Sequence, residues 1–546
     1  MEKQLTKIWE EYEKGKNFLQ KKDIYSRSER CHEFVDGDQW SGLNVPKGVE
    51  RPAQLNILAP IMKSSTALVG QNTMDIIFSP LNKTYANEKY VAMCEALNKF
   101  VKDTWERLKL DAGIWDILED SFIAGDALAY FYWQDEEIKI EYLDNTNIIF
   151  ADENNPHIQK QPYILIPQRK YLQDVKQEAA ANGLAMEDIE GIVADESEET
   201  AWGEEEKKNE DKVTVITKLW KSQGTVHIAR AARTVQYQPD TVLQGENNGI
   251  VSALSLYPVV KYSWKLRKNS ARGVGDIWDK IPNQISINKN FYRFETSVKS
   301  GAFPHKIYSS NALSASEVDK LNYPGSSIAV TAGVGQQLDG LIRYLQPGNI
   351  SPYAISIWQD LIKLTRELSG AGDNLENINP EQASGAAINA AREAKTLNVN
   401  AQVAAFKQFV EDIALVWANL WQVYNKDVVA FEDVTIDPTE FIKLKPSVRV
   451  DVSPNSPYSK MAQELNLKEL FLADKISFEE YVSALDDSSN VPKAKLLDIV
   501  AKRQALQEQM AQQQLLMEQQ AMNDMPQVID GGGDRNAMQE MQYGAI

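Results

Sequence analysis

The sequence predicts an α+β fold in which helices and strands occupy separate stretches of the chain. Apolar residues recur at helical spacing over long stretches, most clearly at 275–300 and 386–424. Aromatic and β-branched residues gather in strand-like runs within 127–152 and 213–264. A segment punctuated by Gly, Ser and Pro, 301–350, separates two helical stretches, which predicts a small insert of mixed structure.

The first 125 residues are predicted to be mainly helical, with one short strand. Apolar residues of the N-terminal stretch follow a rough helical period, and Gly125 is placed to end the last helix. The predicted helices cover 1–33, a stretch that begins at Arg51, 87–108 and 111–124, and the strand runs from Asp75 to Pro80.

The next part of the chain is predicted to form strands around one helix and an acidic loop. Residues 127–152 predict a hairpin with its turn near Asp135, followed by a third strand. The dense acidic run 187–211 has few apolar residues and predicts a solvated loop. The helix is expected at 168–185, and further strands at 213–221, 225–230 and 259–264.

Two helices flank the small insert, and a long helix follows them. The first spans 275–300, and its regular part is expected to begin near Pro282 because proline is tolerated only in a first turn. The second spans 351–368. The long helix covers 386–424, and any break in it is expected near 396–400.

The C-terminal part is predicted to return to strands and then become helical. Strands are expected at 428–436 and 448–452, and two short helices at 457–487 around a turn at 473–475. A Gln- and Met-rich helix begins at Pro492 and runs to about Met525, and the glycine-containing tail beyond it is expected to be disordered.

The overall charge argues against a protein that grips nucleic acid in a positive groove. The formal net charge is -19 and the pI is near 4.9, whereas simple nucleic-acid-coating proteins are basic. A protein that lets DNA slide past is still compatible with this charge. Only Cys31 and Cys94 occur, so no disulfide framework is expected. We expect neither a signal peptide nor a membrane span.

The chain offers no recognisable catalytic motif. The stretch from Leu368 to Asn398 runs from a glycine-rich loop into a helix, as phosphate-binding loops do. It lacks their Gly-Lys-Ser/Thr ending, and its own carboxylates would repel a triphosphate. The four histidines are scattered, with no metal-ligand spacing. We therefore predict no enzyme activity, no metal and no cofactor.

The order of several motifs resembles that of tailed-bacteriophage portal proteins, the head-to-tail connectors. HEFVDGDQW, then RPAQLNILAPIMKSSTALVGQN and DIIFSP, resembles the opening of that family. SGAGDNLENINPEQASGAAINAAREAK resembles its channel loop, and PYSKMAQELNLKELFLADKISFEEYVSAL resembles the helical region after the long helix. The resemblance covers roughly residues 30–500.

The resemblance implies a portal architecture with named parts. The implied parts are a wing at 1–274 with a return at 425–455, a first stem helix at 275–300, a small α/β clip at 301–350, a second stem helix at 351–368, a tunnel loop at 369–385, a long helix under the wing at 386–424, a helical crown at 456–500, a Gln-rich helix at 501–526 and a disordered tail at 527–546. Copies of the Gln-rich helix either form a barrel or remain separate polar helices.

The resemblance also implies roles for particular residues. The tunnel loop would carry the polar groups that face DNA, namely Asp373, Asn374, Glu376, Asn377, Asn379, Glu381 and Gln382. Lys289, Arg293 and Lys299 on the first stem helix are candidates to line the channel, unless they face solvent or pair with neighbouring acids. Tyr308, Leu313, Leu321 and Tyr323 are candidate docking residues of the clip, unless they form its own core. Arg392 and Lys395 are candidate contacts between subunits.

The implied function is a conduit for DNA packaging and ejection. The family forms a ring of usually twelve identical subunits at one capsid vertex of the virion, assembled in the cytoplasm of the bacterial host. Its expected partners are double-stranded DNA without sequence specificity, terminase, major capsid and scaffold proteins, and a head-tail adaptor protein. The alternatives are another ring- or shell-forming virion protein, and a Mg²⁺-dependent enzyme of nucleic acid that uses Asp373, Glu376 and Glu381.

Overall fold

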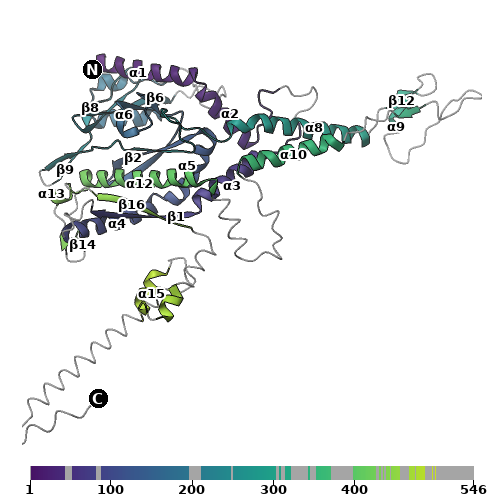
Figure 1. The fold of residues 1–546 in the computed structure, drawn as a ribbon. Coiled ribbons are helices and arrows are strands. Elements are labelled where there is room, and N and C mark those ends of the chain that lie inside the picture. Colours follow the sequence, from purple (N-terminus) through teal and green to yellow (C-terminus); the bar gives the residue numbers. More distant parts are fainter. Residues whose placement is uncertain are drawn as a thin grey trace, which may run out of the picture. The chain divides into compact units, whose positions relative to one another are not determined.

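A computed structural model describes most of the first 453 residues and part of the remainder. The described residues are 2–43, 52–80, 88–195, 211–247, 250–302, 306–308, 314–320, 342–344, 352–370, 397–425, 430–431, 434–435, 438–442, 444, 446–454, 467–473, 475–485, 495 and 499. The chain divides into two compact units, Met1–Ser453 and Pro454–Ile546. The fold mixes helices and strands, as the sequence predicts (Figure 1).

A five-stranded antiparallel sheet forms one layer of the first unit. Its strands are β4 (Ile149–Phe150), β5 (Tyr163–Tyr171), β6 (Lys212–Ser222), β7 (Thr225–Ala231) and β8 (Gln238–Val242), in that order. Successive strand residues point to opposite faces. Ile164 and Ile166 therefore join the main core, while Leu165 faces a separate cluster that includes Ile8 of the N-terminal helix.

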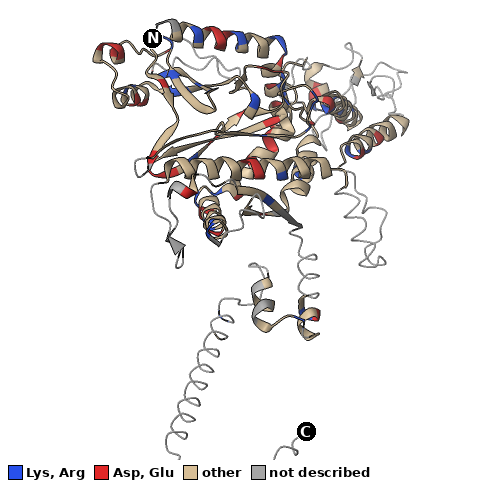
Figure 2. Ribbon diagram, turned by 60° about the vertical axis from the view of Figure 1, so that its left-hand side comes forward, with Lys and Arg blue, Asp and Glu red and all other residues tan. Residues whose placement is uncertain are grey.

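Helix α1 (Glu2–Lys21) packs closely on this sheet. Gly15 makes the close approach possible, because a Cβ there would lie 2.2 Å from the Ile149 side chain. Trp9 also donates a hydrogen bond from its indole N–H to the Ala232 carbonyl at 3.0 Å. Basic and acidic residues are interspersed along α1, whereas the long helix α12 (Asn400–Tyr424) is mostly uncharged (Figure 2).

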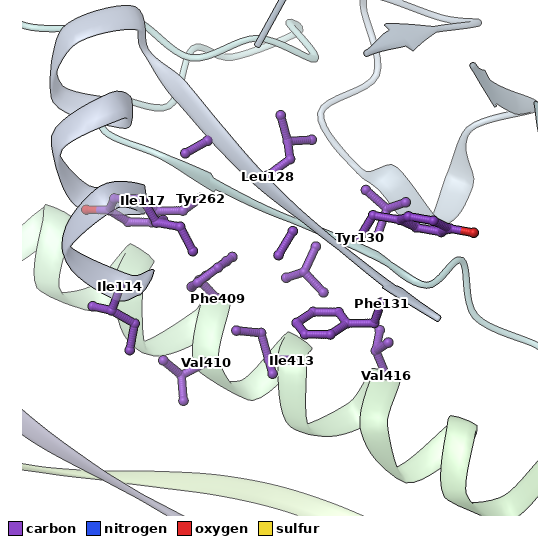
Figure 3. Close-up of a cluster of buried hydrophobic side chains, with 14 of the residues drawn as sticks. Ile114, Ile117, Leu128, Tyr130, Phe131, Tyr262, Phe409, Val410, Ile413 and Val416 are labelled. Carbon is purple, nitrogen blue, oxygen red and sulfur yellow. The ribbon is translucent and has the colours of Figure 1, made fainter. Parts of the chain in front are cut away.

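A three-stranded sheet and α12 form the centre of the main core. The strand order is β11 (Val259–Ser263), β2 (Asp126–Gln134), β3 (Glu137–Asp144), all antiparallel. Buried side chains of β2, including Leu128 and Phe131, meet Phe409, Ile413 and other residues of α12 (Figure 3). Helix α5 (Leu110–Ala124) covers the same cluster with Ile114 and Ile117.

The remaining elements of the first unit complete this core and its edges. The helices are α2 (Ile24–Asp36), α3 (Leu58–Gly70), α4 (Glu88–Arg107), α6 (Leu172–Ala181), α7 (Met186–Glu190), α8 (Ile281–Ala302), α9 (Ala315–Lys320), α10 (Pro352–Leu368) and α13 (Pro438–Phe441). The further two-stranded sheets are β1 (Asn72–Pro80) with β16 (Pro446–Pro454), β9 (Gln244–Asn247) with β10 (Ile250–Ala253), β12 (Lys306–Tyr308) with β13 (Ile342–Tyr344), and β14 (Ala430–Phe431) with β15 (Val434–Thr435).

The second unit is described only in part. A helical turn at 467–472 and α15 (Phe478–Ala484) flank the predicted turn near 473–475, which confirms two short helices there. Phe471 stacks on Tyr481 with ring centroids 5.2 Å apart, so these helices share an aromatic contact. The predicted Gln-rich helix at 501–526 and the tail at 527–546 lie outside the described residues.

Several sequence predictions need correction. The helix predicted at 1–33 is two helices, because Asp23 adopts a left-handed backbone with φ of 55° and separates α1 from α2. The helix predicted at 168–185 begins only at Leu172, since residues up to Tyr171 belong to β5 and pair with β6. The acidic stretch after 186 begins with the short helix α7. Strands β8, β9 and β10 were not predicted.

Candidate functional site

The distinctive structural feature is a pair of helices, α8 and α10, that brackets the insert at 301–350. Ile281 and Pro282 occupy the first turn of α8, directly after a single turn of 3-10 helix at Trp278–Lys280. Proline has no N–H to donate and is accommodated there, so the predicted start of the helix is confirmed.

Helices α8 and α10 lie side by side and antiparallel (Figure 1). Trp358 of α10 donates from its indole N–H to the Ile287 carbonyl at 3.2 Å and stacks on Phe291 with centroids 5.9 Å apart. One end of the pair is fixed by Asn283, which donates to the Thr365 hydroxyl at 3.2 Å. Because higher numbers on α8 meet lower numbers on α10, the chain goes out along one helix and returns along the other.

A buried amide network fastens the start of α8 to the first unit's body. The Asn288 side-chain carbonyl accepts from the Leu55 N–H at 3.0 Å, and its amide donates to Gln39 at 2.6 Å. Gln284 accepts from the Ile57 N–H at 3.1 Å and donates to the Leu55 carbonyl at 2.7 Å. Both side chains are fully buried. The polar atoms of both side chains nevertheless have hydrogen-bond partners, and these bonds hold α8 in one orientation.

A second buried network holds the segment that leads from β11 into α8. Arg272 donates to Glu153 at 3.1 Å, to the Ile148 carbonyl at 2.8 Å, and to the Asn145 carbonyl. The Asp126 carboxylate accepts twice from the Gly273 N–H, at 2.9 and 2.8 Å. We interpret these contacts as a rigid joint between the sheets and the helix pair.

Burial changes the pKa of a charged side chain at this joint. Lys261 lies 3.9 Å from Asp126 at a buried position. Burial lowers the pKa of the Lys261 ammonium, and the Asp126 charge opposes that shift.

Gly275 is required at the same joint, because a Cβ there would lie 2.4 Å from the Ile123 carbonyl oxygen. The sequence offered one signal for these joints: Gln284 and Asn288 are polar residues four apart on an otherwise apolar side of the helix.

The predicted stem cations lie on α8 and are exposed. Lys289 and Arg293 share one side of the helix, and Asn283, Ile287, Phe291 and Phe294, which contact α10, lie on the other. Lys299 forms an ion pair with Glu295 at 2.5 Å. Lys289 forms no ion pair with any residue that the structure describes.

The insert between the helices is described in three short pieces. Strands β12 and β13 pair antiparallel, with Tyr308 opposite Ile342, and α9 lies between them in sequence. Ser314 lies directly before α9, and its N–H and hydroxyl both donate to the Glu317 carboxylate at 2.8 Å, which lowers the pKa of that carboxyl. The described pieces of the insert therefore include both a strand pair and a short helix. The candidates Leu313, Leu321 and Tyr323 lie outside the described residues.

The predicted tunnel-loop residues and the candidate contacts between subunits belong to a part of the chain that the structure does not describe. Asp373, Asn374, Glu376, Asn377, Asn379, Glu381 and Gln382 lie outside the described residues, as do Arg392 and Lys395. Helix α12 begins at Asn400, directly after a turn at 398–399, which is where the sequence predicts a break in the long helix.

The described residues contain no arrangement suited to metal binding. No group of three or more His, Cys, Asp or Glu side chains among them could hold a metal ion.

Cys31 and Cys94 are both buried, and burial raises the pKa of these thiols to about 12 and about 11. Burial, together with neighbouring carboxylates such as Asp144, raises the pKa of Asp120 to about 7.

Comparisons with protein-family models and with curated proteins find no match to this chain. Within the described part of the chain, no helix is both long and apolar enough to cross a membrane.

Proposed function

We propose that this chain is a subunit of a phage portal ring, a conduit for DNA at one capsid vertex. The observation that carries the proposal is the antiparallel pairing of α8 and α10 around an insert with its own strand pair, β12–β13. In this proposal, α8 and α10 are the stem, the insert is the clip, and the sheet-containing part of the first unit is the wing. Residues 456–500, of which the structure describes a helical turn at 467–472 and α15, are the crown, and the chain has no catalytic role.

The two buried networks fit the mechanical demands of such a ring. A stem that surrounds moving DNA must keep its angle to the wing, and Asn288, Gln284 and Arg272 fix that angle through buried and partly buried hydrogen bonds. The net charge of -19 fits a conduit that avoids gripping phosphates, because each neutralised phosphate adds salt-dependent affinity.

The clip is the proposed docking platform for terminase during packaging and for a head-tail adaptor afterwards. Ile307 in β12 is half exposed, beside Tyr308, so this strand pair presents apolar surface for a partner. The wing and crown are the proposed contacts of major capsid and scaffold proteins. The site of action is the virion, after assembly of the ring in the bacterial host cytoplasm.

Two alternatives remain as proposals of lower rank. Another ring- or shell-forming virion protein shares the lack of catalytic groups. A Mg²⁺-dependent enzyme of nucleic acid would use Asp373, Glu376 and Glu381, but the sequence around them is rich in Gly and Asn and predicts a loop, and catalytic ligands need rigid support. Incubation of the purified chain with linear DNA and Mg²⁺ tests the enzyme directly, and we expect the DNA to remain intact.

Deletion of residues 373–382 is expected to leave ring assembly unchanged and to impair packaging or retention of DNA. The physical reason is that this segment would supply polar side chains toward the channel and not the contacts between subunits. Ring mass in solution and packaged DNA per particle are the two measurements. A control variant replaces Asp373, Glu376 and Glu381 with Asn, Gln and Gln, which separates charge from loop length. Loss of rings would show that the loop is a subunit contact.

A further inference from the structure

The outer side of α10 exposes a row of large apolar side chains. Tyr353 is 80% exposed, Ile357 65%, Leu364 53% and Leu368 82%. Their spacing places all four on one side of the helix, over a length of about 22 Å. This side is distinct from the one that packs on α8 through Trp358 and Thr365. We call these four residues the α10 stripe.

A row of this kind is unusual on a protein that acts as a monomer. Soluble monomers rarely leave large contiguous apolar patches in water. Burial of one such side chain stabilises a complex by roughly 1.5–3 kcal/mol. The α10 stripe therefore indicates a partner, and its apolar side chains favour a protein surface over the charged phosphate backbone of DNA.

The charges beside the stripe identify the chemistry of the partner. Asp360 lies on the same side of α10 as the stripe and is exposed. Lys289 lies on the side of α8 that faces away from α10 and is exposed as well. Neither side chain forms an ion pair with any described residue. Each chain thus carries an apolar side with a carboxylate on α10 and a side with an ammonium group on α8. The charges of these two sides are complementary.

The register of the pair places these two charges at one height. Asn283 of α8 lies opposite Thr365 of α10. Since the helices are antiparallel, each step forward on α8 corresponds to one step back on α10. Lys289, six residues beyond Asn283, is therefore level with residue 359, next to Asp360. Phe291 and Trp358, which stack, fit the same register.

We infer that the α10 stripe and Asp360 of one copy pack against the Lys289 side of α8 in the next copy of this chain. The inference rests on the proposed ring. In a closed ring, neighbouring copies are related by rotation about the axis without translation along it, so residues at equal heights meet where the helices run along that axis. The contact joins two different surfaces, as a ring requires. Lys289 then has a carboxylate of its neighbour as its partner instead of DNA.

Crosslinking tests this contact in the full chain. A variant with both Lys289→Cys and Asp360→Cys is treated with a short bismaleimide crosslinker, and the products are separated under denaturing conditions. We expect a ladder of multiples of the chain mass. The parent chain is the control for Cys31 and Cys94, which are buried. Each single variant is expected to give no ladder, because the two positions belong to different surfaces.

The outcomes separate this inference from the proposed function. Rings without a ladder overturn the inference and leave the ring in place. Dimers from Lys289→Cys alone overturn it as well, because they indicate a two-fold contact. If no rings form, both this inference and the proposed function are contradicted. A ladder from the double variant alone supports the contact.

Charge reversal gives a second, independent measurement. Asp360→Lys places two cations together and is expected to raise the dissociation constant between subunits about tenfold or more at low salt. Combination with Lys289→Asp is expected to restore assembly, because the pair is re-formed with opposite polarity. Gln359→Lys, exposed on another side of α10, is the matched control and is expected to assemble normally. Failure of the double reversal to recover assembly, when Asp360→Lys has weakened it, contradicts the contact.

Discussion

Replacement of Arg272 by methionine is expected to lower the free energy of unfolding of the first unit by about 3–5 kcal/mol. The guanidinium is buried and donates to Glu153, to the Ile148 carbonyl and to the Asn145 carbonyl. Methionine fills a similar volume but donates nothing. The variant therefore leaves the Glu153 carboxylate and two carbonyls without their partner in a place that water does not reach easily.

Urea unfolding measured by tryptophan fluorescence checks this prediction. Arg267→Met is the matched control, because Arg267 is exposed just before the turn at 268–269, close to the same segment, and forms no ion pair with a described residue. The control is expected to change the free energy by less than about 0.5 kcal/mol. A loss below about 1 kcal/mol for Arg272→Met would mean that the joint is not a main source of stability.

Replacement of Trp417 by alanine is expected to cost about 3–5 kcal/mol of unfolding free energy. The side chain is fully buried in α12, and its ring meets Phe131 and Trp421 with centroids 5.7 and 5.9 Å away. Alanine leaves a cavity where the helix, the three-stranded sheet and α4 converge, and neighbouring aromatic rings cannot close it completely.

The matched control for this prediction is Trp417→Phe. The indole N–H of Trp417 is buried and has no hydrogen-bond partner among the described residues. Phenylalanine removes that unpaired donor and keeps most of the ring contact, so the loss is expected to stay under about 1.5 kcal/mol. Equal losses for the two variants, measured by the same urea titration, would argue against the cavity explanation.

The sequence predicted the elements whose cause is local. Pro282 marks the start of α8 because its ring is compatible only with the first helical turn. The turn between β2 and β3 falls at Asp135 and Glu136, both with positive φ, between two strands of aromatic and β-branched residues. In each place, a few neighbouring residues determine the structure.

The predictions that failed depend on partners far away in the sequence. Residues 168–171 look helical in isolation but lie in β5, where pairing with Thr214 and Val215 of β6 decides the outcome. Strand β9 (QGEN) has weak strand composition and is explained by tertiary contact, since Gly245 lies against the Val423 carbonyl of α12 and β10 pairs with it. Such contacts cannot be inferred from spacing along the chain.

The same distinction applies to the candidate site. The helix pair and its insert were predicted, because their apolar periodicity and punctuation are local features. The networks at its base were missed, since Asn288 finds Gln39 and Arg272 finds Glu153 only once the chain has folded. The channel roles of Asp373, Glu376 and Glu381 remain predictions from the sequence.

Electron microscopy of the purified full-length chain in negative stain tests the central claim most directly. Closed rings of about twelve subunits with a central hole are the result that the portal proposal predicts, and linear DNA incubated with the same sample and Mg²⁺ should stay intact. Dispersed monomers that cleave the DNA in a Mg²⁺-dependent manner would contradict it.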